Sequence, residues 1–112
     1  DESVVDAYQA DPLCGFDPTI GLARDLLTGV QMNERPENLA KMDKTLPVLF
    51  ISGSKDPVGA MSKGVLACID AFKRNGLRNI SIKLYPNDRH EVLNEQNKDE
   101  VYQDVLNWLE AH

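Results

Sequence analysis

The stretch PVLFISGSKDPVG, residues 47–59, decides the fold class of this chain. It opens with a continuous apolar run, which is typical of a strand buried on both faces of a parallel sheet. The glycine, serine and proline residues that follow predict a turn. Beyond the turn, a helical pattern is indicated by one apolar stripe, which consists of Met61, Val65, Cys68, Ile69 and Phe72. Two basic residues and then Gly76 predict the end of that helix.

A second strand is predicted by NISIKLY, residues 79–85. The residues alternate, so we expect a half-exposed strand near a sheet edge. One face would carry Ile80, Ile82 and Leu84, and the other Ser81, Lys83 and Tyr85. A last helix is indicated by the capping-box spacing of Asn97 and Glu100. Its predicted buried stripe consists of Val101, Val105 and Trp108.

The order strand, helix, strand, helix predicts an α/β fold with two parallel strands and a right-handed crossover. Two parallel strands alone do not make a stable sheet. We therefore expect the rest of the sheet to lie in sequence outside this chain or in a partner chain. The chain does not begin with Met, which also favours a piece of a larger protein.

Residues 1–45 read as short helices joined by turns. Thr19 is placed to cap a helix, and Pro36 breaks its pattern before another short helix. The helix after Thr19 has an apolar stripe, which consists of Ile20, Ala23, Leu26, Leu27 and Val30. We expect two regions, 1–45 and 46–112.

Composition narrows the function classes. The 112 residues are 42% hydrophobic and 27% charged, with a net charge of −6, which is typical of a globular protein and unfavourable for nucleic acid or anionic membranes. No apolar run is long enough to cross a membrane, and the acidic start is unlike a signal peptide. Cys14 and Cys68 form no disulfide framework and indicate a reducing, cytoplasmic compartment. Cys68 is expected to be a small core residue.

Asp56 and His90 each follow a predicted strand. Because the carboxyl ends of adjacent parallel strands meet at one edge of a sheet, these two side chains are expected to lie close together. A carboxylate that accepts a hydrogen bond from one imidazole nitrogen leaves the other nitrogen free to act as a base. Two simpler interpretations stay open: Asp56 with Pro57 as a helix cap, and His90 as a solvated loop residue.

The flanking charges Asp88, Arg89 and Glu91 are interpreted as solvated, and the terminal His112 is given no role. A nucleophile elbow G-x-S-x-G is absent from the sequence. Its nearest match, AMSKG around Ser62, lies inside a helical pattern and not directly after a strand, so we reject it. Ser52 and Ser54 are predicted to be turn residues. No phosphate-binding or metal-ligand spacing is present, so we expect no cofactor and no metal.

Together, residues 47–59 and the stretch YPNDRHEVLNE, residues 85–95, resemble the last third of an α/β-hydrolase. The resemblance is closest to the lysophospholipase and monoacylglycerol lipase group, whose domain is also called serine aminopeptidase-like. In that family the acid lies in a G-x-x-D-P-V type turn, and the histidine lies in an R-H-E-x-x-N-E type loop. Asp56 and His90 fall on these positions. Residues 6–16 resemble the segment that links the cap helices back to the core.

The resemblance implies that 1–45 are cap or linker helices and that 46–112 are the last β-α-β-α part of the hydrolase core. It implies hydrolysis of a small-molecule ester or lipid, with Asp56 and His90 as two members of a Ser-Asp-His triad. The nucleophilic serine would lie in an N-terminal part of the same hydrolase, so the chain alone is expected to be inactive. The charged loop would then present His90, and its neighbours would hold the loop.

Three alternatives stay open. Another reaction on the same fold, such as peptide hydrolysis or epoxide opening, is one. A non-catalytic α/β interaction module, in which Asp56 only caps and His90 only fills a loop, is the second. The third concerns the stripe that begins at Ile20, which fits either a cap over an acyl pocket or plain core packing.

Overall fold

A computed structural model describes residues 2–112. The elements, in chain order, are α1 (Glu2–Ala10), α2 (Ile20–Glu34), α3 (Pro36–Leu39), β1 (Val48–Gly53), α4 (Lys63–Arg74), β2 (Ile80–Tyr85) and α5 (Lys98–Ala111). They divide into two compact units, the first ending at Leu39 and the second running from Ala40 to His112. The expected alternation of strand and helix is therefore present in the second unit.

The first unit consists of helices joined by turns. The predicted cap of α2 is confirmed: the Thr19 hydroxyl oxygen accepts a hydrogen bond from the Leu22 backbone N–H at 3.1 Å. No residue of α2 is buried, and Ile20 is 89% exposed. The apolar stripe of α2 is therefore exposed among the described residues, and both interpretations of it stay predictions.

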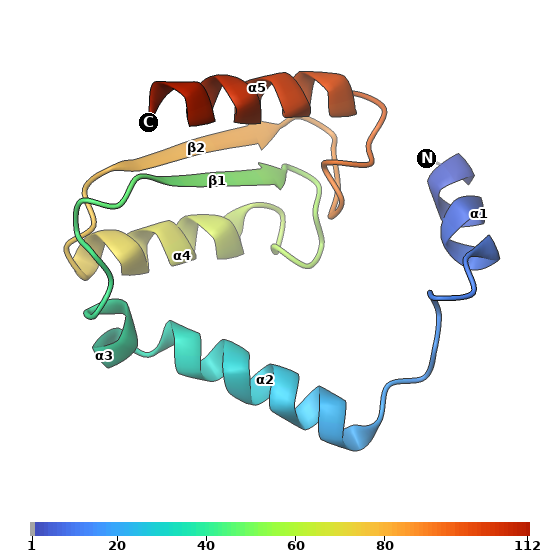
Figure 1. Ribbon diagram of the computed structural model, residues 1–112, viewed down its shortest axis with the longest axis horizontal. Helices are drawn as coiled ribbons and strands as arrows, with labels where there is room; N and C mark the ends of the chain where they lie inside the picture. Colours follow the sequence, from blue (N-terminus) through green and yellow to red (C-terminus); the bar gives the residue numbers. More distant parts are fainter. Residues whose placement is uncertain (1) are drawn as a thin grey trace. The chain divides into compact units, whose positions relative to one another are not determined.

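The second unit is built around β1 and β2, which pair in parallel from Val48 opposite Ile80 to Gly53 opposite Tyr85. Figure 1 shows α4 and α5 on opposite faces of this pair. The α/β class and the parallel pairing predicted from the sequence are confirmed. Because the strands run in parallel and in register, both carboxyl ends lie at one edge of the unit.

The two faces of β1 contact different helices. The Phe50 ring meets the Phe72 ring of α4 edge-on, with centroids 5.4 Å apart. Ile51, one residue on, packs against the buried cluster of Tyr85, Val92 and Val101. The strand is thus covered on both faces, as the apolar run predicts, although its first four residues are only half-buried. Among the described residues β1 pairs with β2 alone, so its other edge is open.

The sequence interpretation of β2 is corrected at Tyr85, which was placed on the half-exposed polar face and is fully buried. Its hydroxyl donates a hydrogen bond of 3.0 Å to Asp104 Oδ2 on α5. Lys83 Nζ lies 3.0 Å from the same carboxylate oxygen. The polar face of β2 is thus the face that α5 covers, whereas Ile82 on the apolar face is 43% exposed.

Helix α4 begins at Lys63, later than its apolar stripe predicts. Met61 and Ser62 precede it in the left-handed conformation, at φ 52° and 69°. Cys68, expected in the core, is exposed, whereas Ile69 is buried. The predicted C-terminus is confirmed: α4 ends with two basic residues, and Gly76 follows at φ 95°.

Helix α5 buries Val101 completely, as predicted. The prediction of a capping box is wrong, because the Asn97 side chain makes no cap hydrogen bond. Glu100 instead lies 3.6 Å from Lys83 Nζ. His112, which was given no role, stacks on Trp108 at a centroid distance of 4.6 Å.

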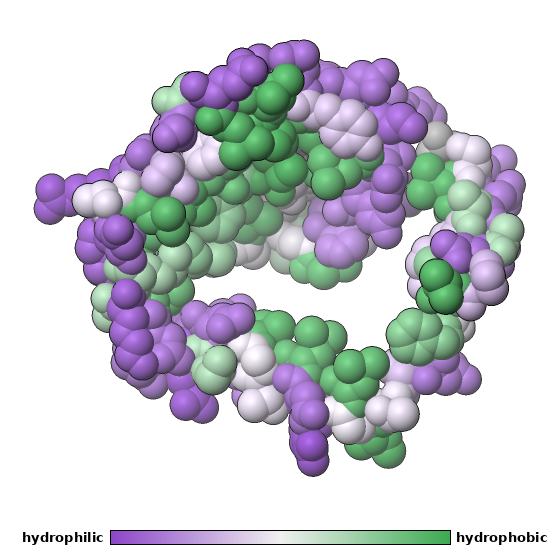
Figure 2. All heavy atoms as spheres, viewed as in Figure 1, coloured by the Kyte–Doolittle hydropathy of each residue, from purple (hydrophilic) through white to green (hydrophobic). Residues whose placement is uncertain are grey.

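Apolar side chains remain open on the second unit. Figure 2 shows a broad hydrophobic area between the helices that cover the sheet. The exposed large apolar residues on its strands and helices include Leu66, Ile82, Leu106 and Leu109. No helix among residues 2–112 is long and apolar enough to cross a membrane.

Candidate active site

Asp56 lies in the turn that leaves the carboxyl end of β1. Its side chain is 6% exposed, and its Oδ1 accepts the Val58 backbone N–H at 2.8 Å. This closes a short turn in which an aspartate mimics a backbone carbonyl. The helix-cap interpretation of Asp56 and Pro57 is wrong, because α4 begins only at Lys63. One carboxylate oxygen therefore shapes the turn, and the other is left for a different partner.

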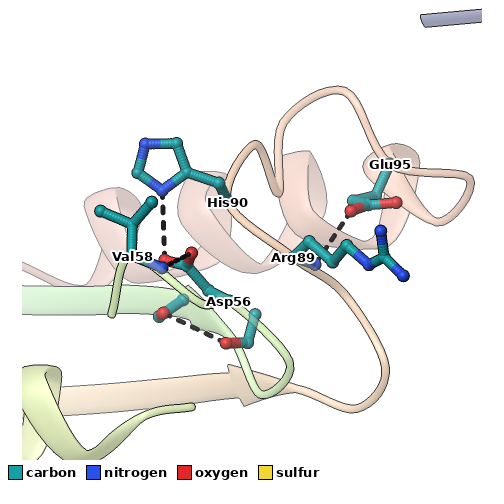
Figure 3. A network of polar contacts seen from close by, with 7 residues as sticks. Asp56, Val58, Arg89, His90 and Glu95 are labelled. Carbon is teal, nitrogen blue, oxygen red and sulfur yellow. Dashed lines mark hydrogen bonds and ion pairs between the residues drawn. The ribbon is translucent and has the colours of Figure 1, made fainter. Parts of the chain in front are cut away.

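That partner is His90, in the loop that leaves β2. Its Nδ1 lies 3.1 Å from Asp56 Oδ2, as Figure 3 shows. The structure thus brings together the two residues that the sequence predicted to meet. The His90 side chain is 61% exposed whereas that of Asp56 is buried. The imidazole is therefore accessible, and the carboxylate that holds it is not.

The hydrogen bond defines which imidazole nitrogen carries the proton. An ionised carboxylate has only acceptors, so Nδ1 donates and the other nitrogen, Nε2, is left with its lone pair. Nε2 points away from Asp56 in Figure 3, and no described residue hydrogen-bonds to it. The arrangement is suited to accepting a proton at Nε2 and to stabilising the imidazolium that forms.

The surroundings of Asp56 keep its carboxylate ionised. Burial raises its pKa, but the hydrogen bond from His90, the backbone N–H groups of Val58 and Gly59, and the charge of His90 all lower it. The net effect is a pKa below the ordinary 3.8 of an aspartate. At neutral pH the acceptor of the His90 proton is therefore present.

Gly53 lets the two loops approach each other. A Cβ at this position would overlap backbone atoms of Asp88 and Arg89, which directly precede His90. The contact involves backbone, so no side-chain rotation would relieve it. The backbone of the His90 loop thus packs directly against the backbone of the last residue of β1.

Backbone hydrogen bonds join the loops around this contact. The Ser54 N–H donates to the Tyr85 carbonyl, and the Lys55 N–H donates to the Asp88 carbonyl, each at 2.9 Å. The Ser54 hydroxyl oxygen accepts the Asn87 N–H at 3.0 Å. Ser54 is thus a turn residue, as predicted, whereas Ser52 lies within β1. These bonds hold the residues before Asp56 against those before His90.

The interpretation of the flanking charges as solvated is partly wrong. Arg89 and Glu91 are exposed, but Asp88 is only 8% exposed and its Oδ2 is buried without a hydrogen-bond partner. Glu95, half-buried, accepts the Arg89 backbone N–H at 2.9 Å. The sequence analysis gave Glu95 and Gly53 no individual role, although Glu95 ends the R-H-E-x-x-N-E motif and a glycine at a strand end signals a close approach of backbone.

Ser62 lies near the Asp56 turn but is no elbow serine. It sits directly before α4, is 7% exposed, and has a buried hydroxyl oxygen without a partner among the described residues. Its rejection as a nucleophile rests on this burial as well as on its place in the chain. Among residues 2–112 no group of three or more histidine, cysteine, aspartate or glutamate side chains is arranged to hold a metal ion.

Parallel strands covered by helices on both faces, with an acid after one strand and a histidine after the next, define the α/β-hydrolase class. Comparison with protein families identifies the family within this class. The model of the family described as serine aminopeptidase, S33, matches residues 1–97. The chain therefore belongs to this family.

Two relatives agree with this placement. A monoacylglycerol lipase of Mycolicibacterium smegmatis (strain ATCC 700084 / mc(2)155) is 35% identical over 115 residues, which cover 100% of this chain. A highly thermostable carboxyl esterase from Bacillus coagulans, solved in complex with glycerol, is 31% identical, with a TM-score of 0.82 over 99% of this chain. The chain spans 38% of the lipase and 36% of the esterase.

Proposed function

We propose that this chain supplies the acid, Asp56, and the base, His90, of a serine hydrolase that cleaves carboxylic esters. The observation that carries the proposal is the 3.1 Å contact between His90 Nδ1 and Asp56 Oδ2 at the carboxyl ends of two parallel strands. Two relatives named as a lipase and an esterase support the ester class. The substrate would be a monoacylglycerol, a lysophospholipid or another small carboxylic ester.

The nucleophilic serine is proposed to lie outside these 112 residues. No G-x-S-x-G elbow is present in the sequence, and the chain spans little more than a third of either relative. An N-terminal part of the same hydrolase would therefore bring the serine and the oxyanion donors. The helices up to residue 45 would belong to the cap or its linker. The low cysteine content supports a cytoplasmic location.

The proposed reaction follows from the geometry of the pair. As the serine oxygen bonds to the ester carbonyl carbon, His90 Nε2 takes the serine proton, and the Asp56 carboxylate stabilises the imidazolium. The tetrahedral intermediate then loses its bond to the alcohol oxygen, to which His90 returns the proton. A water molecule repeats the sequence on the acyl-enzyme, releasing the acid and restoring the serine.

A second candidate, hydrolysis of a peptide bond at an amino terminus, is favoured by the name of the matching family, serine aminopeptidase. It would use the same pair, with an amine as the leaving group. Turnover of aryl esters and monoacylglycerols, compared with aminoacyl amides, separates the two candidates on one enzyme preparation.

The first test is intact-mass spectrometry of the native protein after treatment with a fluorophosphonate. We expect a polypeptide that contains this chain, or one bound to it, to gain the probe mass on a serine. A native protein that consists only of the 12.5 kDa chain and stays unlabelled would overturn the proposal and favour a non-catalytic module.

The second test replaces the acid in the native, complete hydrolase. Asp56→Asn keeps an oxygen for the Val58 N–H but favours the wrong imidazole tautomer, so we expect turnover to fall by up to about 10⁴-fold without unfolding. Asp70→Asn, at an exposed position of α4, is the matched control and should leave turnover unchanged. Near-normal turnover in Asp56→Asn would show that this residue is not the acid.

A further inference from the structure

The peptide that directly precedes His90 is held from two sides. On one side it rests against Gly53, where a Cβ would overlap backbone atoms of Asp88 and Arg89. On the other side the Arg89 N–H donates to Glu95 Oε1 at 2.9 Å. Both Arg89 and Glu95 are labelled in Figure 3, and the dashed line marks this bond.

The bond between Arg89 and Glu95 closes the loop around His90. Glu95 follows a short turn in which the Asn94 N–H donates to the Glu91 carbonyl at 2.8 Å. That turn brings the Glu95 carboxylate back to the residue before His90. A carboxylate oxygen accepts this hydrogen bond, and an amide oxygen at the same place could accept it as well.

We propose that Glu95 is a positioning residue for His90: its carboxylate oxygen, through the Arg89 N–H, holds the imidazole where Nδ1 meets Asp56. The proposal rests on the proposed function and adds a residue to it. His90 itself is largely exposed, so packing alone does not hold its ring. The backbone on either side of it must supply the restraint, and small displacements of a catalytic base reduce rates steeply.

Two variants at position 95 of the native, complete hydrolase separate the effect of side-chain length from the effect of side-chain charge. Glu95→Gln keeps an oxygen at the same distance from the Arg89 N–H and removes the charge. Glu95→Asp keeps the charge and withdraws the oxygen by one methylene. We expect Glu95→Asp to lower kcat by about 10- to 100-fold with KM within about twofold, and Glu95→Gln to retain most of the wild-type kcat.

Glu100→Ala is the matched control, because this exposed carboxylate lies on α5 and forms an ion pair with Lys83 at 3.6 Å. Its kcat should stay within about twofold of wild type. The rate of serine labelling by a fluorophosphonate gives a readout that is independent of the ester used. It should follow kcat, while the thermal midpoints of both Glu95 variants stay close to that of wild type.

Each outcome decides one statement. Wild-type kcat in Glu95→Asp, or an equal loss in Glu95→Asp and Glu95→Gln, would overturn the positioning role, since neither result depends on the reach of the oxygen. Wild-type turnover in Asp56→Asn would instead overturn the proposed function. If kcat falls in Asp56→Asn but not in Glu95→Asp, Asp56 keeps its proposed role as the acid and only the positioning role of Glu95 is overturned.

Discussion

At Gly53, a single hydrogen atom in place of a side chain decides whether the two site loops can meet. The residue ends β1, and backbone atoms of Asp88 and Arg89 occupy the space of its missing Cβ. The approach lets the Lys55 N–H reach the Asp88 carbonyl at 2.9 Å. The geometry of the Asp56–His90 pair therefore depends on a residue that touches neither of them through a side chain.

Gly53→Ala should destabilise the protein by about 3 kcal/mol or more, because overlap with backbone is relieved only by moving the loop. Turnover should fall with it. Gly29→Ala, on α2, is the matched control: nothing lies within 4 Å of its added Cβ, and the substitution should raise stability by up to about 1 kcal/mol. Urea unfolding of the native, complete protein measures both, and equal effects of the same sign would contradict this account.

The segment between the Asp56 turn and α4 is the most unusual element. Ala60, Met61 and Ser62 adopt φ values of 50°, 52° and 69° in succession, a left-handed conformation that costs each non-glycine residue about 1–2 kcal/mol. The Met61 N–H donates to the Asp56 carbonyl at 2.8 Å. Strain of this kind tends to lie beside functional sites, and here it borders the turn that carries Asp56.

Ala60→Gly should therefore raise the free energy of unfolding by about 0.5–1 kcal/mol, because glycine adopts positive φ without penalty and Ala60 is exposed. Ala67→Gly makes the same change in the middle of α4 and should lower it by about 1 kcal/mol. The two variants are compared by chemical unfolding of the same native protein. A loss of stability in Ala60→Gly would show that the left-handed turn is not strained.

At the scale of the whole molecule, hydrogen bonds to ionised carboxylates hold elements of the second unit together. Asp104 accepts from Lys83 and Tyr85, and those two hydrogen bonds, the first foremost, lower its pKa below the ordinary 3.8. The pKa values of Asp56 and Asp43 are lowered as well. A group whose folded pKa is depressed adds stability that is complete above its unfolded pKa and is lost as the pH falls through the folded pKa.

Stability should therefore decrease as the pH falls below about 4. In Asp104→Asn the decrease should be shallower, because one of the depressed carboxyl groups has been removed. The exposed Asp70→Asn, on α4, should keep the wild-type slope. Unfolding free energies measured in urea between about pH 2 and pH 6 test this, and a wild-type slope in Asp104→Asn would contradict the role assigned to that carboxylate.

Much of the fold was predictable because it depends on local patterns. The apolar run of β1, the alternation of β2 and the Thr19 cap each reflect a period or a cap that the chain carries by itself. The meeting of Asp56 and His90 followed from one topological rule, that parallel strands end at one edge. Two predictions of burial were wrong. Tyr85 was expected to be half-exposed and is buried, because α5 covers the polar face of β2. Cys68 was expected in the core and is exposed on α4.

The α/β order, the family resemblance and the pair Asp56 and His90 could be predicted from the amino-acid sequence, since they rest on periodicity and on motifs within short stretches. Three features became visible only in the folded chain: the 3.1 Å contact of that pair, the close backbone approach at Gly53 and the hydrogen bond from Arg89 to Glu95. These features join residues from different loops, and their geometry is set by how closely two backbones approach. That distance results from packing of the whole unit, which no local pattern encodes.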